Sequence, residues 1–147
     1  MPTDAPAPRP GAARGLGGPW TSRHAWMLFA AYAVALALIA LWPTHVDAPA
    51  APLVGWFIDR IPGLTYNRLE FAANVALFVP FGLLAALALR RSRYLVLPAA
   101  IVVTVTIEAW QSLGDGRTAS LLDVVANTTG AALGILIAAY ITRPRRR

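Results

Sequence analysis

Residues 121–141, LLDVVANTTGAALGILIAAYI, form an apolar stretch of the length that a helix needs to cross a bilayer. Two polar residues interrupt it, Asp123 and Asn127, which are four positions apart and therefore share one helix face. Gly130 and Gly134 follow at a similar spacing and extend that face. Because polar side chains at this depth usually face a bundle interior or a wet cavity, the face is a candidate functional surface.

Three further apolar stretches of similar length precede this one, at residues 25–42, 71–89 and 94–113. Hydrophobic residues make up 57% of the 147-residue chain and charged residues only 14%. Soluble domains average about 45–50% and 25%, respectively. We therefore predict an all-α membrane protein, a bundle of four transmembrane helices. This organisation leaves no soluble domain to carry a nucleic-acid surface, so no nucleic-acid partner is expected despite the net charge of +6.

The arginine residues predict the orientation of the bundle. Three lie in the N-terminal tail, three in residues 90–93 and four in the C-terminal tail. The other two loops hold Arg60, Arg68 and Arg117. Because cytoplasmic segments carry the excess of basic residues, we predict a multi-pass plasma-membrane protein with both termini in the cytoplasm.

The predicted domain organisation has three parts: a disordered tail at residues 1–24, a transmembrane domain at 25–142, and a basic cytoplasmic tail at 143–147. A cleaved signal peptide with its cleavage site at residues 48–50 is the alternative for the first stretch. Residues 52–61 are apolar and aromatic but too short to span. We interpret them either as a short helix in the outer interface or as a loop over the helix ends.

Under this orientation, the polar residues of the apolar stretches all fall in the outer half of the membrane. Glu108 and Gln111 are three positions apart on one face of the third stretch, and Asn74 lies early in the second. A carboxylate at the depth of Glu108 needs a cation, an arginine partner or a proton. We predict that Arg117, in the short outer loop, joins Glu108 to Asp123. The predicted ligand-binding or polar network comprises Asn74, Glu108, Gln111, Arg117, Asp123 and Asn127.

These residues also have structural interpretations. Asparagines in membrane helices often bond to neighbouring helices. Asp123 can be a charge favoured by the helix dipole, and Asp123 or Ser120 can cap the first turn. Glycine pairs favour close helix packing, and a proline in mid-span predicts a kink. The predicted packing and kink positions are Pro80, Gly82, Gly130 and Gly134. No histidine cluster or phosphate-binding loop is present, so we expect no metal and no cofactor.

Three motifs stand out: NVALFVPFG at residues 74–82, a Glu-x-x-Gln at residues 108–111, and a spaced series that follows them. The series is Arg117, Ser120, Asp123, Asn127, Gly130 and Gly134. Over about residues 66–138 these motifs resemble the VanZ-like family of small bacterial integral membrane proteins. That family is named for low-level resistance to lipidated glycopeptide antibiotics of the teicoplanin type. The resemblance therefore implies a protein of the cell envelope and a link to antibiotic resistance.

Three classes of function are compatible with this pattern. In the first, an outer-leaflet polar pocket binds an amphiphile, such as a lipid head group or a lipidated glycopeptide, and Arg117 meets its anionic group. In the second, a membrane enzyme acts on a lipid-linked cell-wall intermediate, with Glu108 or Asp123 as general acid or base. In the third, the chain is a small transporter or a structural subunit. The favoured interpretation is the first, with membrane lipids as partners.

Overall fold

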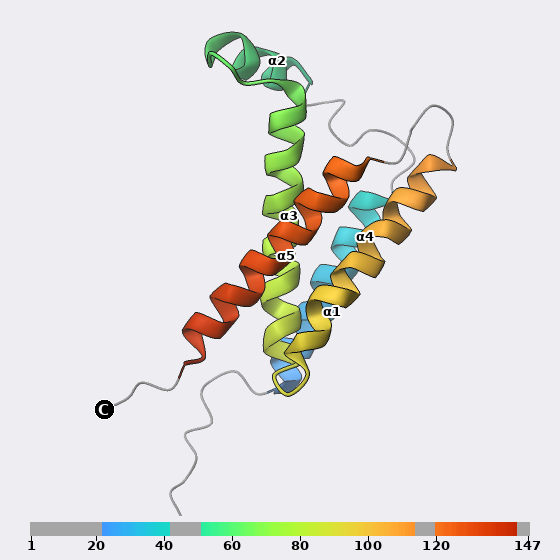
Figure 1. The fold of residues 1–147 in the computed structure, drawn as a ribbon, viewed down its shortest axis with the longest axis vertical. Coiled ribbons are helices and arrows are strands. Elements are labelled where there is room, and N and C mark those ends of the chain that lie inside the picture. The colour runs from blue at the N-terminus through green and yellow to red at the C-terminus, as the bar shows by residue number, and fades with distance from the viewer. Residues whose placement is uncertain (1–21, 42–50, 114–119, 144–147) are drawn as a thin grey trace, which may run out of the picture.

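The computed structural model describes residues 22–41, 51–113 and 120–143. Within these ranges the chain is all-helical (Figure 1). Its elements in chain order are α1 (Ser22–Ala40), α2 (Ala51–Arg60), α3 (Tyr66–Ala88), the 3-10 turn η2 (Arg93–Leu95), α4 (Val96–Ser112) and α5 (Leu121–Ile141).

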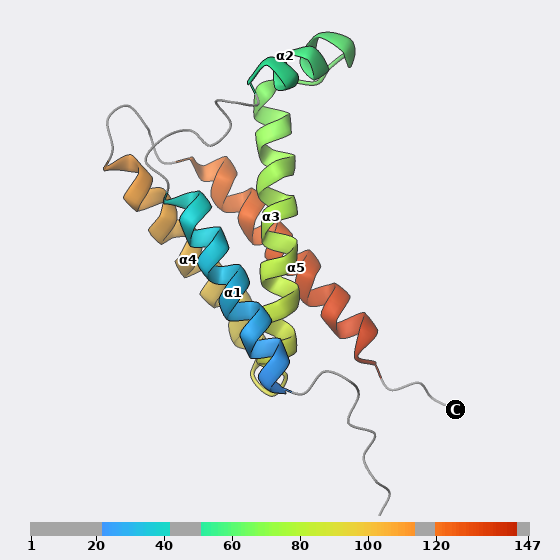
Figure 2. The same ribbon diagram turned by 180° about the vertical axis from the view of Figure 1, so that it is seen from behind.

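Four of the described helical segments are long and apolar enough to cross a membrane, which confirms the predicted fold class. They are Arg23–Ala40, Tyr66–Ala88, Arg93–Ser112 and Leu121–Ile141. The start of α1 and the end of α5 lie toward the same end of the bundle (Figures 1 and 2). Which side of the membrane that end faces stays a prediction.

The helix boundaries follow capping as well as hydrophobicity. The helix α5 has the predicted bounds, and Ser120 caps it with a side chain that accepts a hydrogen bond from the Asp123 backbone N–H. In contrast, α3 begins at Tyr66, five residues before the predicted start at residue 71. The Thr65 side chain accepts a hydrogen bond from the Arg68 backbone N–H there and satisfies one free donor of the first turn. Likewise, α1 includes residues 22–24, the last three of the predicted tail.

The segment before α3 is a helix, α2, rather than a loop. It lies across the beginning of α3 (Figures 1 and 2). The turn between them contains Gly63, whose φ of 80° is a left-handed conformation that glycine adopts without a steric cost. Within α2, the Arg60 guanidinium carbon lies 4.4 Å from the centroid of the Trp56 ring. The location of α2 in the outer membrane interface stays a prediction.

The core of the bundle is built around α3. The buried side chains of Phe78 and Phe81 are 5.6 Å apart between ring centroids, and Phe29 of α1 packs 5.5 Å from Phe81. The helix continues through Pro80, although proline removes the hydrogen bond to the Ala76 carbonyl. In the same turn, the Tyr32 hydroxyl of α1 donates to the Leu77 carbonyl at 2.6 Å. A kink at Pro80 stays a prediction.

Glycines bring the backbones of α3 and α5 into direct contact where the two helices cross. A Cβ atom on Gly82 would lie 2.1 Å from the Ala131 carbonyl oxygen. Equivalent atoms on Gly130 and Gly134 would lie 2.3 and 2.2 Å from carbonyl oxygens of α3. This close crossing fixes the start of α5 against α3 and so positions the polar residues near that end.

Candidate functional site

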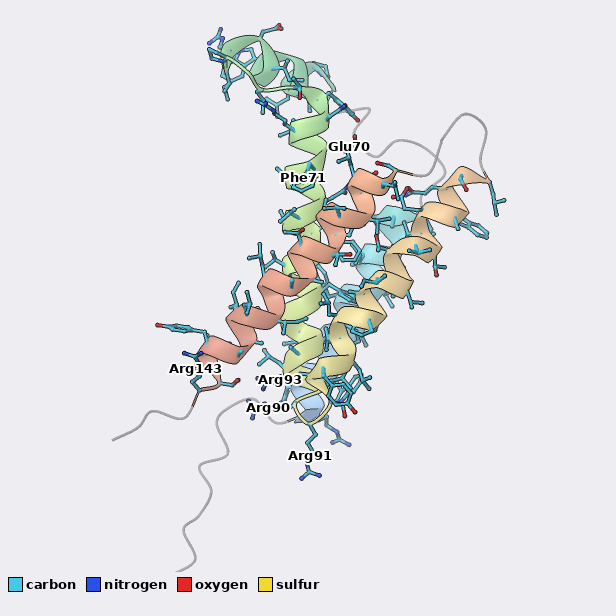
Figure 3. All side chains as sticks on the ribbon, viewed as in Figure 1. Glu70, Phe71, Arg90, Arg91, Arg93 and Arg143 are labelled. Atoms are coloured by element: carbon cyan, nitrogen blue, oxygen red, sulfur yellow. The ribbon has the colours of Figure 1, made fainter. Side chains whose placement is uncertain are left out.

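Polar side chains from three helices are joined by hydrogen bonds where α4 ends and α5 begins. This end of the bundle is the one that carries α2, while the arginines of the α3–α4 connection lie at the other (Figure 3). We call these residues the polar layer: Asn74, Thr104, Glu108, Ser120, Asp123 and Asn127.

Asp123 links α5 to α3. The Asn74 side-chain amide nitrogen Nδ2 donates to the Asp123 carboxylate oxygen Oδ1 at 2.9 Å, and both side chains are half-buried. Asp123 lies in the first turn of α5, where the helix dipole favours a negative charge. The structure thus pairs this carboxylate with an amide that lies 49 positions earlier in the chain.

Glu108 links α4 to the beginning of α5. Its side chain is only 6% exposed, and its carboxylate oxygen Oε2 accepts a hydrogen bond from the Ser120 backbone N–H at 2.8 Å. The N–H groups that precede and open a helix are free to bind an acceptor. Ser120 therefore serves two purposes, since its side chain caps α5 while its backbone orients the buried carboxylate.

One helical turn deeper, Asn127 of α5 pairs with Thr104 of α4. The Asn127 amide nitrogen Nδ2 donates to the Thr104 hydroxyl at 2.6 Å. Thr104 is 0% exposed and Asn127 is 5% exposed. The second amide atom of Asn127, the oxygen Oδ1, is buried and accepts no hydrogen bond within the described part of the chain. Such an atom is an available acceptor for a water molecule or a ligand.

Two residues of the predicted network lie outside this arrangement. Gln111 donates from Nε2 to the Ala40 carbonyl at 2.8 Å, so it ties α4 to the end of α1. Arg117 lies outside the described residues, as does the network predicted around it. Of the remaining predicted residues, the structure bonds Asn74 to Asp123, whereas Glu108 and Asn127 each bond to a residue outside the predicted set.

Thr104 is not among the residues predicted from the sequence. It lies four positions before Glu108, the same helical spacing that separates Asp123 from Asn127. This spacing was the available signal, because the two pairs lie on facing helices that run in opposite directions. The contact between Ser120 and Glu108 was also missed, although Ser120 was considered as a cap.

The chemistry of the polar layer is that of hydrogen-bond acceptors. Its two carboxylates accept hydrogen bonds, and the buried Asn127 oxygen can accept one. The amides of Asn74 and Asn127 already donate to protein atoms. Within the described ranges, no group of three or more histidine, cysteine, aspartate or glutamate residues could hold a metal ion.

A family model described as VanZ/LLP1 matches residues 28–142. The matched range runs from within α1 to the residue after α5 and includes every member of the polar layer. No match was found among curated proteins or among solved structures.

Proposed function

The chain belongs to the VanZ/LLP1 family, and from this premise we propose that it is a cell-envelope membrane protein whose polar layer binds the head group of an amphiphile. The observation that carries the proposal is the burial of Glu108, which is 6% exposed and is the one charged residue of α4. Ionisable groups inside membrane helices are costly, and they are usually retained where they serve a ligand or ion pathway.

The acceptor groups define the kind of head group that fits. Glu108 and Asp123 supply carboxylates, and Asn127 supplies the oxygen that has no donor among the described residues. A head group with amine, amide or hydroxyl donors complements them. Arg117 follows α4 in the sequence, and its guanidinium would suit a phosphate or carboxylate of the same molecule. Membrane lipids with amine or sugar head groups and lipidated glycopeptides both carry such groups.

Native mass spectrometry of the full chain in detergent tests the proposal, with phosphatidylethanolamine and teicoplanin as probes. We expect Glu108→Gln to weaken binding of at least one probe about tenfold, because a hydrogen bond to a charged group contributes about 1.5–3 kcal/mol. Asp59→Asn is the matched control, since it makes the same change at an exposed carboxylate of α2. It should leave binding unchanged.

Thermal unfolding of the same variants separates binding from folding. If Glu108→Gln lowers the unfolding temperature but leaves the affinity for both probes unchanged, Glu108 is a structural residue and the proposal fails. Binding that is lost equally in Asp59→Asn would also contradict it, because the loss would then follow net charge and not the polar layer.

The proposal includes a location and an orientation. In the plasma membrane with both termini cytoplasmic, the polar layer lies toward the outer leaflet, where a glycopeptide antibiotic arrives. Reporter fusions after Arg93 and after Arg147 should both give a cytoplasmic signal. Expression in a susceptible bacterium should raise the inhibitory concentration of teicoplanin, and Glu108→Gln should remove that increase.

A further inference from the structure

The end of the bundle opposite the polar layer carries a cluster of arginines. Arg90, Arg91 and Arg93 lie in and next to the connection between α3 and α4, and Arg143 follows α5 (Figure 3). Two segments that are distant in the sequence therefore place guanidinium groups toward the same end of the bundle. We call these four residues the basic end.

Two contacts show how the basic end is held together. The Arg93 guanidinium nitrogen Nη2 lies 3.4 Å from the Thr142 hydroxyl, which it reaches across the gap between η2 and the end of α5. The Thr142 hydroxyl in turn donates to the Ala138 carbonyl at 2.7 Å. Arg93 is half-buried, whereas Arg90, Arg91 and Arg143 are exposed. One arginine is thus positioned by the protein, and three extend into the surroundings.

The charge of the basic end is not balanced by the described residues. Their carboxylate side chains all belong to the other end: Asp59 in α2, Glu70 near the start of α3, Glu108 near the end of α4, and Asp123 at the start of α5. The separation of charge along the bundle axis leaves the basic end with a field that attracts anions.

Exposed tyrosines mark the level of the basic end relative to a membrane. Tyr94 follows Arg93 and is 73% exposed, and Tyr140 lies three positions before Arg143 and is 76% exposed. Tyrosine is enriched at membrane–water interfaces, where its ring contacts the acyl region and its hydroxyl contacts the head groups. The anionic groups nearest to these arginines are then lipid phosphates, which guanidinium groups bind in a bidentate geometry.

We propose that the basic end is a binding site for an anionic phospholipid, with the phosphate held between Arg93 and the exposed arginines. This site is separate from the polar layer and lies in the opposite leaflet. Polybasic segments next to membrane spans bind anionic lipids through the same attraction. The match between the tyrosine level and the arginine level favours a lipid over a soluble anion.

The test measures the affinity of the full chain for phosphatidylglycerol and phosphatidylcholine by titration in detergent, read by native mass spectrometry. Detergent exposes both ends of the bundle, so the result does not depend on orientation. We expect phosphatidylglycerol to bind more tightly than phosphatidylcholine. Replacement of two exposed arginines, Arg90→Gln with Arg91→Gln, should weaken phosphatidylglycerol binding about thirty-fold.

The matched control is Arg60→Gln with Arg68→Gln, which removes the same charge from the other end. This double replacement should change the affinity for phosphatidylglycerol less than about threefold, because exposed charges far from the site are largely screened by salt. Equal affinity for the two lipids, equal loss in both arginine pairs, or displacement by inorganic phosphate would each overturn the proposal.

Discussion

The two main contacts of α5 differ in kind, although the hydrogen bond between Asn74 and Asp123 adds one polar link to the contact with α3. Against α3 it packs backbone to backbone, because Gly130 and Gly134 on one side and Gly82 on the other leave no room for a side chain. Against α4 it is joined by hydrogen bonds, between the side chains of Asn127 and Thr104 and between the Ser120 backbone N–H and the Glu108 carboxylate. One helix therefore combines a contact determined by shape and a contact determined by hydrogen-bonding groups.

The difference suggests how structure and function are divided along the chain. In a bilayer, helices associate through close packing and hydrogen bonds, since lipid is as apolar as the helices themselves. The backbone contact tolerates no added atom, so it suits a fixed scaffold. The polar contact can exchange one hydrogen-bonding partner for another, which is what a ligand requires. We therefore expect changes at α3 to affect folding first and changes at α4 to affect binding first.

The largest effect is expected at the glycine crossing. Gly82→Ala would place a Cβ atom 2.1 Å from the Ala131 carbonyl oxygen, so the helices must separate. We expect the free energy of unfolding to fall by about 3 kcal/mol, the upper part of the range for overpacking. Unfolding by denaturant in detergent, followed by circular dichroism, measures the change.

The control for this prediction is Gly55→Ala in α2. A Cβ on Gly55 meets nothing within 4 Å, and alanine favours the helix. Stability should therefore be unchanged or slightly higher. If the two alanine substitutions had equal effects, the backbone contact would not be the constraint that the geometry indicates.

The fold could be predicted largely from hydrophobic length. Four apolar stretches define four spans. The bounds of α5 were predicted correctly because its apolar run begins at Leu121, directly after the cap Ser120. The start of α3 was placed too late because Tyr66, Asn67, Arg68 and Glu70 are too polar to belong to a span. They are helical because Thr65 caps them. Hydrophobicity marks where a helix crosses lipid, whereas capping marks where it begins.

The site was less predictable because side-chain pairing depends on helix rotation and crossing angle. Asn74 and Asp123 were both expected in the polar network, but their direct bond follows from the glycine crossing. The spacing of Thr104 from Glu108 was only a weak signal, since threonines in these helices usually bond to their own backbone. Thr106 donates to the Val102 carbonyl and Thr129 to the Val125 carbonyl. Only the facing Asn127 distinguishes Thr104 from them.

A smaller effect is expected at the cap that connects the two contacts. Ser120→Ala removes the acceptor of the Asp123 backbone N–H but keeps the backbone N–H that binds Glu108. We expect a loss of about 1 kcal/mol in the free energy of unfolding. Thr65→Ala, at the cap of α3, is the matched comparison and should cost a similar amount. A much larger loss in Ser120→Ala would show that the hydroxyl also supports the polar layer.

The polar contact can be measured directly with a double-mutant cycle of Asn127→Ala and Thr104→Val. We expect a coupling free energy of about 0.6 kcal/mol, the average for hydrogen bonds between membrane helices. The cycle of Asn127→Ala with Thr129→Val is the control, because Thr129 is exposed and bonds to its own helix, so its coupling should be near zero. Equal couplings in both cycles would contradict a specific contact between α4 and α5.

The smallest change in the free energy of unfolding is expected for substitutions in α2. Its Leu53 side chain is 59% exposed, and Trp56 is 47% exposed with Arg60 over its ring. Side chains that face lipid or water contribute little to helix association. Leu53→Ala should therefore change the free energy of unfolding by less than about 0.5 kcal/mol, as for surface substitutions in general. A loss above about 1 kcal/mol would mean that α2 packs on the bundle. The packing of α2 would then have to be added to the comparison of the α5–α3 and α5–α4 contacts, because α2 lies at the same end of the bundle as the polar layer.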